Sequence, residues 1–328
     1  MIRKPAKSRD PAFGTVIALF PVSLEDTQMF QTTLNNRITF EGIGLHSGET
    51  IQVVVNPSYS ETGVMFRRAD IQGSPYTKAS PYTVTSTQLA TSINCGKGSI
   101  STIEHLMGAL YGLGVDNALV DVYGTEVPIL DGSAYPFVGM IREAGVKELN
   151  IKRKYLKFKK KIIIEKGDKW IELIPSRFFK VTFGISFDDN FVQEQKAYFN
   201  FSDGGFIEDV SKARTFGFKK DVDALHAMGL AKGGSLENAV VVDGSGVLNP
   251  EGLRYSDEFV RHKILDLLGD ISLIGYRFYG HVRAYKSGHM LNNIFARTLL
   301  ESTNCYSIIE QPETPAFGSL LELKPQGI

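Results

Sequence analysis

The hydrophobic pattern of the first half of the chain predicts strands that are followed by helices. Two early segments alternate apolar and polar residues or are rich in β-branched residues, and glycines lie between them. A later segment carries apolar residues every three or four positions, which is the spacing of one helical face. The expected elements are strands at 37–41 and 50–56, a helix at 99–113, a strand at 118–123 and a helix at 134–144.

The second half repeats this order of elements. Strands are expected at 161–164, 170–174 and 181–186, helical segments around 207–212 and 257–268, a strand at 280–285 and a last helix from Asn292. The order strand, strand, helix, strand, helix occurs twice, which predicts an α+β fold of two similar halves. The repeat is visible in the order of elements and not in residue identities.

The length of 328 residues is too great for one average domain and fits two. The expected parts are an N-terminal extension at 1–28, a first α+β domain at 29–150, a second at 151–305 and a tail at 306–328. The apolar run in the extension is too short to cross a bilayer, and no signal-peptide cleavage pattern follows it. At Ile151 begins a run of seven Lys or Arg in eleven residues, which is interpreted as a linker into an exposed strand rather than an anion-binding surface.

Composition and charge then exclude several classes of protein. The chain is 43% hydrophobic, which excludes disorder, and its 36 basic residues balance 36 acidic ones, so no global field for nucleic acid exists. We expect no nucleic-acid partner and no stable membrane insertion, because no stretch approaches 18 uninterrupted apolar residues. The only cysteines, Cys95 and Cys305, lie far apart, which favours a reducing cytoplasm and excludes a Cys-based zinc site. A metal would need His and carboxylate ligands.

One His–Asp pair has the spacing of metal ligands. His262 and Asp266 are four residues apart on an expected helix, so both side chains emerge from one face. A third ligand would complete a zinc site that keeps one position open for water, and His105 is the best candidate, with Glu104 beside it as a base. A surface pair on a helix would also explain the spacing, and H-E-x-x-H is absent. Spacing alone therefore leaves both interpretations open.

Other residues carry weaker signals. Ser99 or Ser101 is expected to cap the helix that follows. His289 lies in a glycine-containing loop before a helix, where it would be exposed enough to titrate near neutrality and act as a general acid, or would be a loop His without a role. Residues 213–218 suit either a substrate wall or plain core. His46 has no assigned role, and a Ser nucleophile has no support because G-x-S-x-G is absent.

Together these motifs resemble one family, the zinc-dependent UDP-3-O-acyl-N-acetylglucosamine deacetylases of lipid A biosynthesis. One such motif would be weak evidence, but seven in the family's order are very specific, and they cover the chain from about Met29 to about residue 300. The motifs are GIGLHSG (42–48), STIEHLMGALYGLGVDN (101–117), PILDGSAYPF (128–137), GDKW (167–170), ARTFGF (213–218), LRYSDEFVRHKILDLLGD (253–270) and KSGHMLNN (286–293).

The resemblance implies a zinc site and a base. His105, His262 and Asp266 would bind one catalytic Zn²⁺ per chain, and Glu104 would be the general base for the attacking water. The reaction would remove the N-acetyl group from UDP-3-O-(3-hydroxyacyl)-N-acetylglucosamine and release acetate.

Three further residues would complete the catalytic group by the same resemblance. The Thr215 hydroxyl would stabilise the tetrahedral oxyanion together with zinc. His289 would face the leaving amine as general acid or electrostatic partner, and Asp270 would hydrogen-bond His289 and favour its cationic form. Whether Glu104 alone or Glu104 with His289 moves the protons stays open.

The resemblance also implies substrate contacts. Lys263 and Lys169 would meet the sugar-diphosphate, and Phe187 and Phe216 would stack on the nucleoside or sugar, although Ser186 stands where the family has an acidic residue just before Phe187. An insert at about 217–243 would form an apolar passage for the acyl chain. Its lining candidates are Phe218, Val222, Ala231, Gly234 and Ser235.

The family fold implies two domains, each a sheet packed on two helices, with the helical layers facing each other around the zinc. Two rival functions are a zinc deacetylase for a different acyl sugar and a silent binding protein for a sugar nucleotide. The sequence indicates neither the acyl-chain length nor the oligomeric state.

Overall fold

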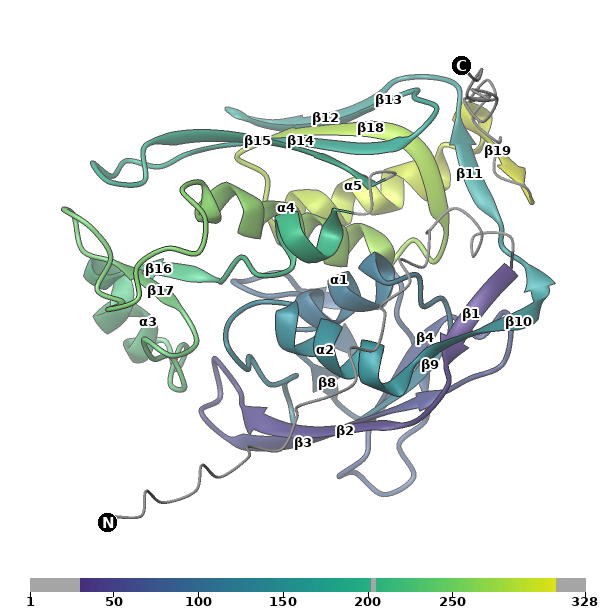
Figure 1. Cartoon of the computed structure of the whole chain (residues 1–328), viewed down its shortest axis with the longest axis horizontal. Coiled ribbons are helices and arrows are strands. Elements are labelled where there is room, and N and C mark those ends of the chain that lie inside the picture. The colour runs from purple at the N-terminus through teal and green to yellow at the C-terminus, as the bar shows by residue number, and fades with distance from the viewer. Residues whose placement is uncertain (1–29, 202–204, 311–328) are drawn as a thin grey trace, which may run out of the picture.

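The structure is a computed structural model, and it describes residues 30–201 and 205–310. The fold is α+β, as predicted, and its longer helices lie between two main sheets (Figure 1). The expected N-terminal extension at 1–28 lies outside the described residues. Of the expected tail, residues 306–309 form a strand, and the part after residue 310 lies outside the described residues.

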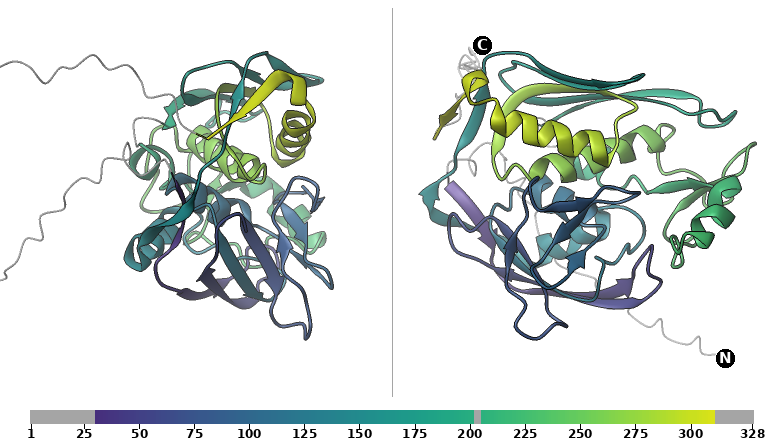
Figure 2. Two further views of the ribbon diagram at one scale, coloured as in Figure 1. Left: turned by 90° about the vertical axis from the view of Figure 1, so that its right-hand side faces the viewer. Right: turned by 180° about the vertical axis from the view of Figure 1, so that it is seen from behind.

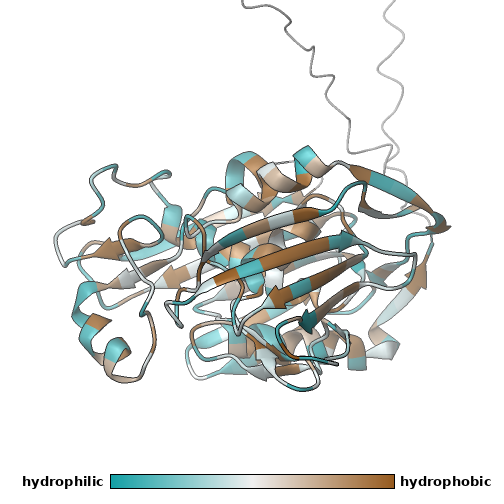
Figure 3. Cartoon of the chain, turned by 90° about the horizontal axis from the view of Figure 1, so that it is seen from below, coloured by the Kyte–Doolittle hydropathy of each residue, from teal (hydrophilic) through white to brown (hydrophobic). Residues whose placement is uncertain are grey.

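The first sheet is formed by residues of the first half of the chain. Its order is β2 (Ile38–Ile43), β3 (Thr50–Pro57), β9 (Ala118–Tyr123), β4 (Val64–Arg68) and β5 (Thr77–Lys78). Neighbouring strands are antiparallel except for the parallel pair β9–β4. Alternate residues of β3, such as Val53 and Val55, are buried, because successive side chains of a strand point to opposite faces. Figure 3 shows hydrophobic and hydrophilic stretches along the strands of the fold.

The second sheet has seven strands and belongs to the second half. Its main path is β12 (Ile162–Lys166), β13 (Lys169–Ile174), β18 (Arg277–Tyr285), β11 (Tyr155–Phe158) and β19 (Tyr306–Ile309). Off this path, β14 (Phe179–Ser186) pairs with β18 and with β15 (Glu194–Asn200). The long strand β18 therefore contacts three neighbours and organises the sheet.

Smaller elements join these sheets. They are β1 (Phe30–Leu34) paired with β10 (Val146–Lys152), the small sheet β6 (Val84–Ser86), β7 (Ser92–Asn94) and β8 (Ser99–Ile100), the π-helix η2 (Phe206–Val210) and the 3₁₀ turn η4 (Thr303–Cys305). Among the described residues, no helix is long and apolar enough to cross a membrane.

Two helices from different halves pack closely in the centre. The central helices are α1 (Glu104–Gly112), α2 (Tyr135–Ala144), α4 (Glu258–Ser272) and α5 (His289–Glu301). A Cβ atom on Gly269 of α4 would lie 2.1 Å from the Glu104 carbonyl oxygen of α1, and one on Gly108 would lie 2.9 Å from Leu265. The two glycines thus permit the approach of α1 to α4, and this approach brings residues of the two halves together.

An insert projects from one end of the molecule. It contains β16 (Phe216–Phe218), η3 (Lys219–Asp221), α3 (Val222–Ala227) and β17 (Val240–Val242), and β16 pairs with β17 in parallel. Figures 1 and 2 show this part beside the layered body rather than within it. No residue of α3 is buried, whereas Val240 and Val242 of β17 belong to the hydrophobic core, so the insert is anchored by its strands and exposes its helix.

Several local predictions are wrong in detail. The first helix begins at Glu104 after Ile103 without a side-chain cap, and Ser99 is part of strand β8, so neither serine caps it. The expected helical segment at 207–212 is the π-helix η2, and the last helix begins at His289 rather than at Asn292. The basic run at 151–161 is not a plain linker, because it contains the end of β10 and the whole of the buried strand β11. The strand that follows the run, β12, is mostly exposed, as predicted.

Candidate metal centre

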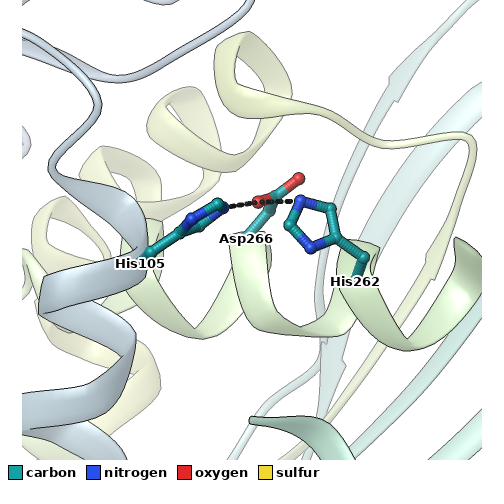
Figure 4. Close-up of side chains that lie close together, drawn as sticks. All are labelled: His105, His262 and Asp266. Atoms are coloured by element: carbon teal, nitrogen blue, oxygen red, sulfur yellow. Dashed lines mark ion pairs between the residues drawn. The ribbon is translucent and has the colours of Figure 1, made fainter. Parts of the chain in front are cut away.

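Three predicted ligand residues converge between α1 and α4. His105 is the second residue of α1, while His262 and Asp266 lie one turn apart on α4. Figure 4 shows the two rings on either side of the carboxylate. Their ligand atoms all lie within 4.8 Å of one another, and all three residues are buried. The His105 and His262 Nε2 atoms are 3.5 and 3.3 Å from the same oxygen, Oδ1 of Asp266.

The hydrogen bonds around this cluster favour a cation at its centre. His262 Nδ1 lies 3.0 Å from the carbonyl oxygen of Ala213, to which it donates, and burial lowers the pKa of His262 to about 3. The ring is therefore neutral at pH 7, and its Nε2 presents a lone pair to the Asp266 oxygen. Two groups rich in electrons at 3.3 Å repel each other unless a cation lies between them. Two neutral imidazoles and a carboxylate form a donor set that zinc prefers.

The negative charge of Asp266 is stabilised by a lysine at Oδ2, the oxygen that does not face the two histidines. Lys263 Nζ donates to Asp266 Oδ2 over 2.7 Å, which leaves Oδ1 to face the two rings. Burial opposes the charge, but nearby positive charge, including the Lys263 ammonium that bonds Oδ2, outweighs it and holds the pKa of Asp266 well below its ordinary value. Asp266 is therefore an anion in the folded protein. Within the described residues, the buried His105 Nδ1 has no hydrogen-bond partner.

The carbonyl that orients His262 is itself fixed by a buried ion pair. Arg214 follows Ala213 and is only 1% exposed, and its Nε donates to Glu258 Oε1 over 2.9 Å. Its backbone N–H donates to the same oxygen over 3.0 Å. Because Glu258 begins α4, this pair holds the Ala213 carbonyl against the helix that carries two of the ligand residues.

Glu104 lies next to the ligand cluster in a buried position. It is 3% exposed, its Oε2 accepts the backbone N–H of Thr91 over 3.1 Å, and burial raises its pKa. Its Oε1 lies 3.8 Å from His289 Nε2. A carboxylate with a raised pKa beside a metal-ligand cluster has the properties of a general base.

His289 is held by a network that reaches three elements. Its Nδ1 lies 2.9 Å from Asp270 Oδ2, which also accepts the side-chain amide of Asn292 over 2.8 Å. Asp270 Oδ1 accepts the Thr91 hydroxyl over 2.5 Å. Burial opposes the imidazolium, but the carboxylates of Asp270 and Glu104 outweigh it and raise the pKa of His289 to about 9. His289 is therefore cationic at neutral pH.

The expected exposure of His289 is wrong. The side chain opens α5 instead of lying in a loop, and it is only 8% exposed. Its position at the first residue of a packed helix explains the burial. The cation is thus maintained by two nearby carboxylates and not by contact with solvent.

Aromatic residues predicted to contact substrate form one cluster beside His262. The Phe216 ring lies 6.3 Å from the His262 ring, and Phe187 lies 5.6 Å from Phe216 and 5.4 Å from Phe218, all between centroids. Thr215 lies between Phe216 and the buried Arg214, and its backbone bonds Gly132 and Val240. The cluster forms a wall directly next to the ligand residues.

The two predicted lysines differ in their surroundings. Lys263 Nζ lies 5.7 Å from the Phe216 ring centroid and bonds Asp266, so it is part of the site. Lys169 is exposed at the start of β13, at the end of the β12–β13 hairpin. In the same hairpin, Lys166 Nζ lies 3.5 Å from Met290 Sδ, next to His289. Lys169 therefore lies on a hairpin that contacts the first turn of α5 through Lys166.

The insert contacts the loop that contains His46. Gly233 N–H donates to the Leu45 carbonyl over 3.0 Å, and the Ala231 N–H lies 3.4 Å from His46 Nδ1. Val222 and Gly234 lie on this insert, and no hydrogen bond or ring contact among the described residues joins either to the ligand cluster. Ser235 lies on the same turn, where its N–H donates to the Asn238 side chain over 2.8 Å.

Sequence reasoning missed three supporting residues. Thr91 bonds both Glu104 and Asp270, but it lies in a loop with no motif that could have marked it. Glu126 accepts the His46 and Ser47 N–H groups at 3.0 Å and fixes that loop; its position two residues before the 128–137 motif was a weak signal. Asn292 lies within the 286–293 motif, but its contact with Asp270 depends on the packing of α5 on α4.

Comparison with known proteins gives an independent finding. The sequence model of the family described as UDP-3-O-acyl N-acetylglycosamine deacetylase matches residues 31–301. A protein of Geobacter sp. (strain M21), named UDP-3-O-acyl-N-acetylglucosamine deacetylase, is 51% identical over 282 residues, which are 86% of this chain and 92% of that protein. Proteins of the same name are 46% identical in Acidithiobacillus ferrooxidans, over 87% of this chain and 95% of theirs, and 44% identical in Campylobacter jejuni (strain RM1221), over 87% and 97%.

Proposed function

The chain belongs to the UDP-3-O-acyl N-acetylglycosamine deacetylase family, and on that premise we propose that His105, His262 and Asp266 hold its catalytic zinc. The family resemblance of the sequence is confirmed, and the protein is a hydrolase that deacetylates UDP-3-O-acyl-N-acetylglucosamine in lipid A biosynthesis. No observation favours a different acyl sugar. The cytoplasmic location stays a prediction.

The observation that carries the zinc proposal is the convergence of three buried donor atoms on one point. Two imidazole nitrogens lie 3.3 and 3.5 Å from a carboxylate oxygen, in a protein interior where burial keeps His262 neutral. Three protein ligands with one open position are the arrangement of catalytic rather than structural zinc. When bound, zinc supplies a Lewis acid that acidifies water and polarises a carbonyl oxygen.

Glu104 would accept the proton of the attacking water. Glu104 immediately precedes the ligand residue His105 at the start of α1, and burial raises the pKa of its carboxyl group, which suits a base. The water oxygen attacks the acetamide carbonyl carbon, and the C–N bond then breaks to give acetate and a free amine. The amine must gain a proton as it leaves.

His289 would donate that proton to the leaving amine as a general acid, or would act as its electrostatic partner. Its pKa of about 9 keeps it cationic at neutral pH, and its Nε2 faces Glu104 at 3.8 Å while Asp270 holds its Nδ1. A protonated imidazole beside a buried carboxylate favours an arrangement in which Glu104 takes the first proton and His289 gives the second. Thr215 would donate its hydroxyl hydrogen to the developing oxyanion.

The remaining predicted residues would bind the substrate. Lys263 and Lys169 would meet the diphosphate, and the Phe187–Phe216 pair beside His262 would hold the nucleoside or sugar. The insert at 217–243, with Phe218, Val222 and Gly234, would bind the acyl chain. Phe218 has support from its ring contact with Phe187, since this contact joins the insert to the aromatic wall.

We also propose that the two sheet-and-helix layers are two domains, with bounds near 29–150 and 151–305. The first layer carries Glu104 and His105, and the second carries His262, Asp266 and His289. The close contact of α1 with α4, with the helices facing each other between the sheets, supports this division (Figure 1). The active site would then lie at the contact of the two domains.

The test measures zinc and acetate together on the full chain. Purified protein is expected to hold about one catalytic zinc ion per chain, and stripping that metal with a chelator should stop acetate release until zinc is returned. Acetate release should also fall strongly on UDP-N-acetylglucosamine without the 3-O-acyl chain. Full activity in metal-free protein would refute the zinc proposal, while equal turnover of both substrates would refute the acyl passage alone.

A further inference from the structure

A second cavity lies at the opposite ends of the two central helices. It has a volume of about 240 Å³, and both halves line it, with Met107 and Tyr111 on α1, Ile274 after α4 and Arg277 on β18. The residues that converge on the proposed metal lie near the beginning of α1 and earlier in α4, and none of them lines this cavity. The cavity is therefore separate from the deacetylase site.

The polar side of this cavity carries more cations than anions. Its charged lining residues are Lys78, Arg153, Lys154 and Arg277 against Glu61 and Asp116. Asp116 Oδ2 forms an ion pair with Arg153 at 2.7 Å, and Glu61 forms one with Lys154 at 3.0 Å. Among the described residues, Lys78 therefore has no ion pair, and Arg277 shares the carboxylate of Asp116 with Arg153.

Arg277 is the buried member of these two. Its side chain is 12% exposed, and its Nε is 3.7 Å from Asp116 Oδ1, beyond hydrogen-bond distance. Within residues 30–201 and 205–310, that buried Nε has no hydrogen-bond partner, whereas Nη2 donates to the Tyr111 carbonyl over 2.7 Å. A buried guanidinium with an unmet donor is costly, and an anion that accepted from it would lower that cost.

The rest of the cavity is apolar. Its hydrophobic lining residues are Val64, Ala79, Met107, Leu110, Val115 and Ile274. A cavity with one cationic side and one apolar side fits a molecule with an anionic head and a hydrocarbon body. The volume is below the usual range of about 300–1,000 Å³ for drug-sized ligands, so the molecule must be small.

We propose that this cavity binds a medium-chain carboxylate, with the carboxylate at Arg277 and the chain against the apolar lining. The guanidinium would attract the carboxylate by its charge and donate a hydrogen bond to it, while Nη2 keeps its bond to the Tyr111 carbonyl. Lys78 would add charge at the exposed rim, since it makes no ion pair within the described part of the chain. A ligand that touches both halves also stabilises the contact between α1 and α4.

The experiment titrates the zinc-loaded full-length enzyme with sodium octanoate by calorimetry and by thermal shift. Octanoate should bind and raise the melting temperature, while acetate and octan-1-ol, which each lack one half of the ligand, should bind at least about tenfold more weakly. The variant Arg277→Gln should weaken octanoate about tenfold or more. Arg283→Gln, which removes the same charge from the same strand outside the cavity, should leave octanoate binding unchanged.

Two further variants separate lost binding from lost folding. Lys78→Gln changes an exposed residue and should still weaken octanoate by a few fold, and Ala79→Leu fills the apolar side while every charge is kept. Loss of binding in Ala79→Leu with a normal melting temperature supports the proposal. Equal octanoate affinity in Arg277→Gln and Arg283→Gln would overturn the proposal, because octanoate bound at the metal site would not respond to a change in this cavity. Octan-1-ol that binds as tightly as octanoate would also overturn it, because the carboxylate would then contribute nothing.

Discussion

The helix pair α1–α4 and the insert at 217–243 are built in opposite ways. Every residue of α1 is buried, and a single added Cβ on Gly269 would lie 2.1 Å from the α1 backbone. In the insert, α3 has no buried residue, and a Cβ on Gly217 would meet nothing within 4 Å. The helix pair is tightly packed throughout, whereas the insert is packed tightly only where it meets the body, as at Gly233, and is open around α3 and Gly217.

This difference matches two chemical tasks. A metal and its proton-transfer groups must hold their positions to within a fraction of an ångström, which requires packed helices and satisfied hydrogen bonds. A hydrocarbon chain requires only apolar contact of about the right length, which a loosely packed segment provides. We therefore expect changes in the helix pair to affect the metal and turnover, and changes in the insert to affect substrate affinity.

The largest expected effect is that of His105→Ala in the helix pair. Removing one of three protein ligands should abolish acetate release and lower the bound zinc well below that of wild type. Zinc content by atomic absorption and acetate release measure both effects. His281→Ala, which removes a histidine from the second sheet away from the cluster, should keep zinc and activity. Normal turnover in His105→Ala would contradict the ligand assignment.

Glu104→Gln should lower kcat by about 10²-fold or more while zinc stays bound. The amide keeps the shape of the side chain but accepts no proton, so the loss falls on the chemical step. Zinc content and kcat measured on the same preparation distinguish this from a ligand defect. A variant that loses zinc in parallel with turnover would show that Glu104 acts on metal binding instead.

Gly269→Ala tests the rigidity of the helix pair directly. The new Cβ would meet the Glu104 carbonyl, so α1 and α4 must separate, and the free energy of unfolding should fall by about 1–3 kcal/mol. Gly217→Ala in the insert is the matched control and should change it by less than about 0.5 kcal/mol. Urea unfolding measures both values. Equal stability of the two variants would mean that the helix contact is not tight.

Asp270→Asn should shift the pH profile of activity. Burial alone would lower the pKa of His289, and the carboxylates of Asp270 and Glu104 raise it to about 9, so the cation is present below that pH and lost as pH rises through it. Without Asp270 the pKa falls, and the alkaline decline of kcat/KM should begin at lower pH. Rates near pH 8 should drop about tenfold, while zinc content stays unchanged. An unmoved alkaline limb would exclude His289 as the group that must be protonated.

The smallest effect is expected in the insert. Val222→Ala removes two methyl groups from α3, and their burial is worth at most about 1.6 kcal/mol, so KM for the acylated substrate should rise by no more than about 15-fold. Turnover at saturation and the free energy of unfolding should stay near wild type, because Val222 is not buried. A fall in kcat with unchanged KM would contradict the proposal that the insert affects substrate affinity and the helix pair affects turnover.

Much of the fold was predictable because it depends on local periodicity. Alternation at 50–56 and helical spacing at 257–268 predict β3 and α4, since each pattern reports which face of an element is apolar. The ends were less predictable. The expected Ser cap before α1 failed because residues 99–100 pair with β7 instead, a contact that no local pattern encodes.

The sequence by itself determined which residue types were available for chemistry. With two distant cysteines, a metal site had to use His and carboxylates, and the four-residue spacing fixed His262 and Asp266 on one helical face. His105 was the best candidate for the third ligand, but only the family resemblance assigned it to the metal, since periodicity does not say which helix faces which.

Tertiary structure alone decided how these residues act on one another. It buried His289 and placed it against Asp270 and Glu104, so a histidine expected to titrate near neutrality has a pKa of about 9. It also placed Arg277 in a second cavity with its Nε unpaired among the described residues. The physical reason is that burial and charge interactions depend on distances between segments, and those distances arise only when the two halves pack together.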